Sequence, residues 1–170
     1  MRTAYEMGVP LDVLSAVDAA NERQKLILGV KIKHALGHNL EGKRIALWGL
    51  AFKAGTDDMR ESPSLTLIEM LLESGVSVSA HDPAAMEHAR ALLHDKIEFA
   101  HNGYEALAGA DALVVVTDWL EYRNPDFSRI RKELREPVII DGRNLYDPER
   151  MREMGIRYYS IGRPATVATD

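Results

Sequence analysis

The chain contains no cysteine in its 170 residues. This absence excludes disulfide bonds, thiolate metal ligands and a cysteine nucleophile within the chain. Because disulfide-free proteins are common where thiols stay reduced, we expect cytoplasmic residence.

Long apolar runs and an excess of basic residues are also missing. No uninterrupted apolar stretch comes near the ~20 residues that a membrane-spanning helix needs, and the first residues, MRTAYE, contain no apolar signal core. The 21 basic residues are outnumbered by 26 acidic ones, which gives a net charge of −5. We therefore expect neither a membrane nor a nucleic-acid partner, although a few cations focused in one cleft would still bind an anion.

The sequence lacks the GxGxxG fingerprint of dinucleotide-binding folds. After the first apolar run of a predicted sheet, Gly49 and Gly55 enclose the bulky Phe52, where the backbone would have to approach a pyrophosphate closely. We therefore predict that NAD does not bind at this first turn. Phe52 either packs on a sugar or base of a ligand or is a buried core aromatic, and both interpretations stay open.

Short apolar runs alternate with helical stretches through the rest of the chain. The strands are predicted at 44–50, 76–81, 97–100, 112–117, 138–141 and 158–161, and the helices at 64–74, 84–94, 104–107, 127–134 and 148–154. Continuous apolar strands alternating with helices are typical of a parallel sheet that is buried on both faces. We predict an α/β fold, a Rossmann-like doubly wound sheet of about six strands in the order 3-2-1-4-5-6, with a loose tail over 163–170.

A long helix is predicted ahead of the sheet, from Pro10 to Leu36. Apolar residues recur near the helical period, Pro10 suits the first turn and Gly37 suits the stop. The stripe consists of Leu11, Leu14, Val17, Ala20, Ile27, Val30 and Ile32. At about 40 Å such a helix is longer than one small domain can cover, so we expect part of its stripe to pack on a partner.

Three cations are predicted at one edge of the sheet. Lys53 and Arg60 follow the first strand, and Arg143 follows the fifth. In this strand order the ligand crevice opens between strands 1 and 4, and such cations suit a diphosphate. The alternative is that the three are surface charges paired with acids of the same loop. Those acids are Asp57, Asp58 and Glu61.

Three aspartates also end predicted strands. Asp82 lies where many Rossmann folds keep a ribose-binding acid, but Pro83 follows it, and an aspartate cap before a first-turn proline is the favoured interpretation. Asp118 and Asp141 are either caps or arginine partners.

One pair of histidines has a spacing that can bind zinc. His34 and His38 are four residues apart at the end of the long helix, but no third ligand is evident nearby. Their position also suits a helix C-terminus, so no metal site is predicted.

Four sequence blocks resemble those of the UDP-glucose/GDP-mannose dehydrogenase family, and the resemblance covers nearly the whole chain. The blocks are NERQK at 21–25, the substrate loop GLAFKAGTDDMRESPS at 49–64, TDWLEYRNPDF at 117–127 and DGRNLYD at 141–147. The third and fourth blocks favour the UDP-glucose branch, whereas the loop at 53–58 is also similar to that of GDP-mannose dehydrogenases.

The resemblance implies a division at residue 38. Residues 1–38 would be the end of a central helical dimerisation region, so that the Pro10–Leu36 helix forms a homodimer, and 39–170 would be a UDP-sugar-binding Rossmann-like domain. Phe52 and Lys53 would contact the UDP-sugar, as would Arg143 from across the dimer interface. Arg60 would reach NAD, which is bound mainly by an N-terminal domain.

The family oxidises the C6 alcohol of a UDP-sugar to a carboxylate with two NAD and a cysteine-linked intermediate. Neither the cysteine nor the NAD fingerprint is in this chain, so the resemblance implies the C-terminal portion of an NAD-dependent enzyme, with no catalytic residue of its own and no activity alone. The alternatives are a stand-alone UDP-sugar-binding module, a dimerisation module with a vestigial cleft, or the equivalent domain of a GDP-mannose or UDP-N-acetylhexosamine dehydrogenase.

Overall fold

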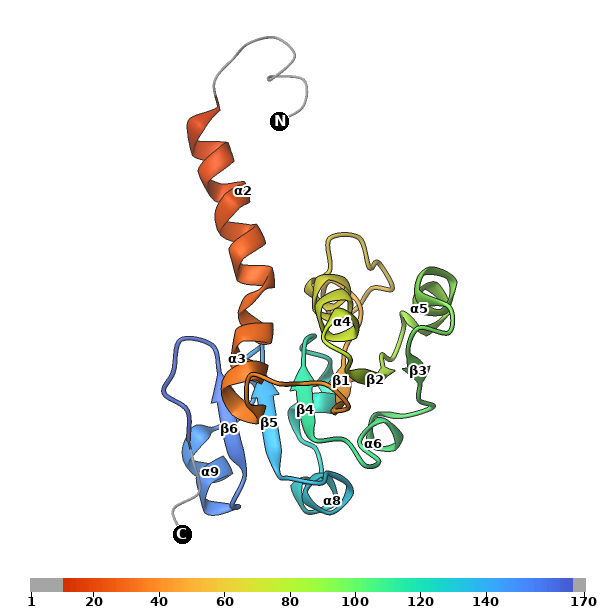
Figure 1. The fold of residues 1–170 in the computed structure, drawn as a ribbon, viewed down its shortest axis with the longest axis vertical. Coiled ribbons are helices and arrows are strands. Elements are labelled where there is room, and N and C mark those ends of the chain that lie inside the picture. The colour runs from red at the N-terminus through yellow and green to blue at the C-terminus, as the bar shows by residue number, and fades with distance from the viewer. Residues whose placement is uncertain (1–10, 167–170) are drawn as a thin grey trace.

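Six parallel strands form the centre of the structure, a computed structural model that describes residues 11–166. The strands are β1 (Arg44–Trp48), β2 (Ser77–His81), β3 (Glu98–Phe99), β4 (Ala112–Val115), β5 (Val138–Asp141) and β6 (Arg157–Ser160). Their spatial order is β3-β2-β1-β4-β5-β6 (Figure 1), which confirms the predicted topology. Trp48 at the end of β1 lies opposite both His81 of β2 and Val115 of β4, so the loops after these strands start at one edge.

Helices cover both faces of this sheet (Figure 1). They are α2 (Asp12–Lys25), α3 (Ile27–Leu36), α4 (Pro63–Glu73), α5 (Met86–Leu93), α6 (Gly103–Ala106), α7 (Leu120–Arg123), α8 (Phe127–Glu133) and α9 (Pro148–Glu153). Ser62 caps α4 and Asp147 caps α9, each followed by a proline at the first helical position, where a missing N–H costs nothing.

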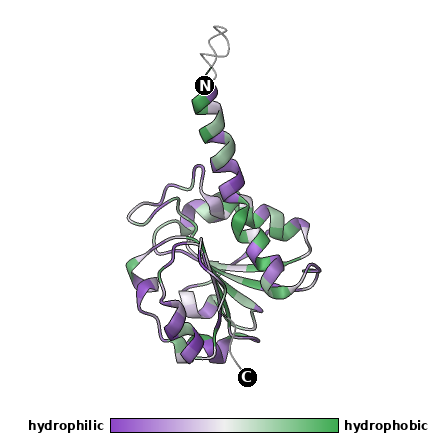
Figure 2. Ribbon diagram, turned by 90° about the vertical axis from the view of Figure 1, so that its left-hand side faces the viewer, coloured by the Kyte–Doolittle hydropathy of each residue, from purple (hydrophilic) through white to green (hydrophobic). Residues whose placement is uncertain are grey.

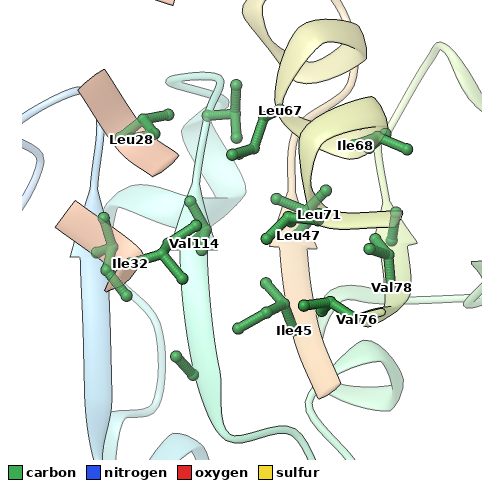
Figure 3. Close-up of a cluster of buried hydrophobic side chains, with 14 of the residues drawn as sticks. Leu28, Ile32, Ile45, Leu47, Leu67, Ile68, Leu71, Val76, Val78 and Val114 are labelled. Atoms are coloured by element: carbon green, nitrogen blue, oxygen red, sulfur yellow. The ribbon is translucent and has the colours of Figure 1, made fainter. Parts of the chain in front are cut away.

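The alternation of side chains along β1 divides the core into two layers. Ile45 and Leu47 pack with α3 and α4 on one face (Figure 3), whereas Ala46 and Trp48 pack with α6 and α8 on the other. All four side chains are essentially inaccessible to water. Burial on both faces explains why the central strands β1, β4 and β5 are mainly apolar.

The predicted long helix is present over residues 12–36, as α2 and α3 with the single residue Leu26 between them. Leu28, Ile32 and Ala35 of α3 pack into the core, while no residue of α2 is buried. Figures 1 and 2 show α2 extending away from the sheet. Val30, predicted as part of the apolar stripe, is exposed, so the buried face of α3 is offset from the predicted one. Pro10 lies outside the described residues.

Two predictions need correction. The third strand contains only two residues, and its Glu98 carboxylate binds the guanidinium of Arg44 at the sheet edge. The described part of the 163–170 tail is not loose, because Thr166 and Tyr158 exchange two backbone hydrogen bonds of 2.9 Å. Within residues 11–166, no helix has the length and hydropathy that crossing a bilayer would require.

Candidate functional site

A depression of about 540 Å³ lies at the carboxyl edge of the sheet, between α2 and the loops that follow β1 and β5. Phe52, Lys53 and Arg143 line it together, although 90 residues separate Lys53 from Arg143 in the sequence. The Phe52 ring is 47% exposed, so it is not a buried core aromatic. These three side chains are the ones predicted to contact a ligand.

Arg143 is held across the crevice by backbone carbonyl groups. Its Nε donates to the oxygen of Val116 at 2.6 Å, and its Nη2 donates to the oxygen of Phe52 at 3.2 Å. Within residues 11–166, no carboxylate pairs with Arg143 or with Lys53. Two positive charges therefore face the depression without an acidic partner in that part of the chain.

Buried side chains fix the backbone just ahead of Lys53. The carbonyl oxygen of Leu50 accepts hydrogen bonds from the hydroxyls of Ser62 at 2.8 Å and Ser64 at 2.6 Å, and that of Ala51 accepts one from Thr117 at 2.7 Å. Because these partners come from the N-terminus of α4 and the end of β4, the loop is positioned by two other elements. Such a preorganised loop can present a cation without first being ordered by the ligand.

Asp82 completes the support of this loop. One carboxylate oxygen accepts the backbone N–H groups of Leu50 and Ala51 and the indole N–H of Trp119, at 2.7 to 3.0 Å, and the other accepts those of Ala84 and Ala85. Burial alone would raise the pKa of Asp82, but the four backbone donors outweigh it and hold the pKa below its usual value. The carboxylate thus caps the turn at 83–85. The prediction that it caps a helix with Pro83 in the first turn is wrong, because α5 begins at Met86 and its N-cap is Ala85. Both carboxylate oxygens are occupied by these donors, so neither is left for a ribose.

Arg60 lies apart from the other predicted site residues. It lines a second depression of about 590 Å³, together with His88 and Leu92 of α5. Its guanidinium binds both oxygens of Asp58, at 2.7 to 3.2 Å, and this contact lowers the pKa of Asp58 to about 2. The alternative of pairing within the loop therefore holds for Arg60 alone among the three cations.

The α2 wall of the depression was not predicted from the sequence. The residues of α2 that line it are Asp18, Asn21, Glu22, Gln24 and Lys25. The Nζ of Lys25 binds Glu22 at 2.8 Å and Glu61 at 2.5 Å. These two hydrogen-bonded carboxylates raise the pKa of Lys25. The NERQK block was the available signal, but it was interpreted only as a dimerisation element.

The remaining candidates have structural contacts. Asp118 binds Arg123 at 3.2 Å, and buried Asp141 accepts the backbone N–H of Arg143 and the hydroxyl of Tyr158. His34 packs edge-on against Tyr159. In the described part of the chain, no three His, Asp or Glu side chains gather closely enough to hold a metal ion.

An open α/β fold with a depression at the carboxyl edge of its sheet is typical of nucleotide-binding proteins. Sequence comparison identifies the family. The profile of the UDP-glucose/GDP-mannose dehydrogenase family, UDP binding domain, matches residues 46–148. The chain therefore belongs to this family and carries its UDP-binding domain.

The individual relatives of this chain include UDP-glucose dehydrogenases and a GDP-mannose dehydrogenase. A UDP-glucose 6-dehydrogenase of Pseudomonas aeruginosa is 47% identical over 175 residues, covering 96% of this chain. The solved UDP-glucose dehydrogenase of Pyrobaculum islandicum is 32% identical with a TM-score of 0.77 over 93% of this chain, and the GDP-mannose dehydrogenase of Pseudomonas aeruginosa is 26% identical with a TM-score of 0.62 over 82%. The chain spans only 37%, 34% and 32% of these relatives.

Proposed function

We propose that this chain is the nucleotide-sugar-binding portion of an NAD-dependent UDP-glucose 6-dehydrogenase, which converts UDP-glucose to UDP-glucuronate. The observation that carries the proposal is the convergence of Phe52, Lys53 and Arg143 on one depression at the carboxyl edge of the sheet. This edge is where open α/β folds bind nucleotides. The family membership and the 47% identity to a UDP-glucose 6-dehydrogenase support the same assignment.

Each of the three residues has a distinct role in this proposal. Lys53 and the free edge of the Arg143 guanidinium neutralise the negative charge of the UDP-sugar, with Lys53 as a mobile point charge and Arg143 as a fixed planar donor. The exposed Phe52 ring offers an apolar surface to the sugar or the base. Arg143 lines the depression of its own chain, so we propose that it acts there and not only across a dimer interface.

The oxidation itself needs groups that this chain does not supply. Converting a primary alcohol to a carboxylate removes four electrons, which two NAD molecules accept, and the cysteine that carries the intermediate has no counterpart in this sequence. We propose that NAD binds mainly to a separate N-terminal half, and that Arg60, which lines the second depression, reaches this NAD. The chain alone then binds the UDP-sugar without oxidising it.

The experiment that tests this proposal is calorimetric titration of the chain with UDP-glucose, UDP, GDP-mannose and NAD. We expect the two uridine ligands to bind, and Lys53→Ala to weaken them about ten- to a hundredfold, the loss of one charge-assisted contact. Lys132→Ala, which removes an exposed lysine of α8, is the matched control and should change nothing.

Each other outcome has a definite meaning. Tighter binding of GDP-mannose than of UDP-glucose would assign the domain to the GDP-mannose branch. Production of NADH by the chain with UDP-glucose and NAD would show that it is catalytic alone. If no ligand binds until an N-terminal half is added, the depression is completed by that half.

A further inference from the structure

Asn144, the residue after Arg143, makes a paired contact that its neighbours in the loop do not. Its Oδ1 accepts the backbone N–H of Ile161 at 2.9 Å, and its Nδ2 donates to the carbonyl oxygen of the same residue at 3.1 Å. The side-chain amide thereby forms both hydrogen bonds that a neighbouring strand would form. It joins the loop after β5 to the end of β6.

The backbone conformation of Asn144 restricts what can replace it. Its φ is +56°, a left-handed value that only glycine, asparagine and aspartate adopt readily. Glycine would fit the backbone but lose both hydrogen bonds with Ile161. Aspartate would keep the acceptor but place a second oxygen against the Ile161 carbonyl. Asparagine alone satisfies the backbone and both partners.

The contact is a second anchor of the loop after β5. The first anchor is the buried carboxylate of Asp141, which accepts the backbone N–H groups of Arg143 at 2.8 Å and Leu145 at 2.7 Å. Asn144 lies between these two residues in the sequence and binds Ile161, at the end of β6. The backbone at Arg143 is thus held by two sets of hydrogen bonds, and its side chain extends to the carbonyls of Val116 and Phe52.

We propose that Asn144 is a positioning residue, which holds the Arg143 guanidinium over the depression for the anionic part of a nucleotide sugar. This inference rests on the proposed function for the identity of the ligand. It assigns to Asn144 an effect on binding that is exerted only through Arg143.

A double-mutant cycle tests the inference with UDP as the ligand. We expect Asn144→Gly to weaken UDP binding about tenfold in the wild-type background, the loss of one well-placed interaction. In the Arg143→Ala background, the same substitution should change the affinity less than about twofold, since the residue through which it acts is gone. Asn144→Asp, which keeps one of the two bonds, should lie between wild type and Asn144→Gly.

Asn102→Gly is the matched control for general destabilisation. Asn102 also bonds the backbone through its amide, as the cap of α6, but it is not among the residues that line the depression. It should lower the melting temperature without changing UDP affinity. An equal loss of affinity from Asn144→Gly in both backgrounds, or no loss in either, overturns the inference.

A second measurement does not depend on the ligand. Phenylglyoxal modifies free guanidinium groups, and peptide mass spectrometry reports the rate at Arg143 alone. Asn144→Gly should raise that rate about fivefold, as expected when one hydrogen bond of the docked side chain is weakened. If the rate rises but wild type binds no UDP, the proposed ligand is wrong and the positioning role stands. If the rate does not change, Asn144 does not position Arg143.

Discussion

Gly49, directly after β1, allows two strand ends to approach each other closely at the candidate site. Its φ is +100°, and a Cβ at this position would lie 2.4 Å from the Cβ and 2.6 Å from the backbone nitrogen of Thr117. Since the nitrogen belongs to the backbone at the end of β4, it cannot move aside as a flexible side chain can. The close approach of two strand ends, which brings Thr117 within reach of the Ala51 carbonyl, therefore requires glycine.

Gly49→Ala should lower the free energy of unfolding by about 3 kcal/mol, from the combined cost of overpacking and a left-handed backbone. Gly42→Ala is the control, because Gly42 also has a positive φ, +73°, but nothing lies within 4 Å of its added Cβ. That variant should lose only about 1 kcal/mol. Urea unfolding followed by circular dichroism measures both values. Equal losses would show that the contact with Thr117 is unimportant.

Some residues of the candidate site were predicted from the sequence, whereas the contacts of others were not. Lys53 and Arg143 were named because the predicted strand order places their loops at one edge, whereas Phe52 was named because it interrupts the glycine pattern and because the resemblance places it beside Lys53. The partners of Asp82 were not predictable, since Leu50, Ala51 and Trp119 reach it from two other strands. A sequence pattern gives the end of a strand but not which of several donors occupies a carboxylate there.

Helices α2 and α3 differ in what holds them. Four residues of α3 are buried in the core, while α2 has none and contacts the domain through the Lys25 ion pairs. Helix periodicity predicted a continuous element here, because apolar residues recur near the helical period on both sides of Leu26. What distinguishes the two parts is packing into the core, in which α3 takes part and α2 does not.

Lys25→Ala should loosen α2 without affecting α3. The side chain of Lys25 is 16% exposed and joins α2 to Glu61 in the loop before α4, so we expect backbone amides of α2 to exchange with deuterium about two- to fivefold faster, the effect of one partly exposed ion pair. Arg23→Ala is the control, since Arg23 has no ion pair within residues 11–166.

High salt tests independently whether loss of the Lys25–Glu61 ion pair causes the faster exchange. Screening by 1 M NaCl should reduce the difference between wild type and Lys25→Ala. If Arg23→Ala accelerates exchange equally, helix propensity and not the contact with Glu61 explains the result.

At the scale of the whole molecule, topology was the most predictable property. Apolar strands alternating with helices, together with right-handed crossovers, restrict a sheet of this size to few orders, and the observed order is the predicted one. Strand ends were less predictable, as the two-residue β3 shows. The division into residues 1–38 and 39–170 stays a prediction, and the structure places α3, within the first part, in the core of the second.

The exposed face of α2 leads to the last prediction, a homodimer formed through this helix. Val13, Leu14 and Val17 lie on one side of α2, at helical spacing, and are 77%, 51% and 50% exposed. A cluster of large apolar side chains on a helix that buries nothing in its own chain is a characteristic of an interface.

Val17→Asp should convert the chain from a dimer to a monomer of 19.0 kDa in size-exclusion chromatography with light scattering, because a carboxylate would be buried without a partner at the centre of the interface. Ser15→Asp adds the same charge two residues away, on the opposite side of the helix, and should leave the dimer intact. A wild-type chain that elutes as a monomer at all concentrations would disprove the homodimer and leave this face for the proposed N-terminal half. Dissociation by both variants would instead indicate that charge on α2, and not the apolar face, controls assembly.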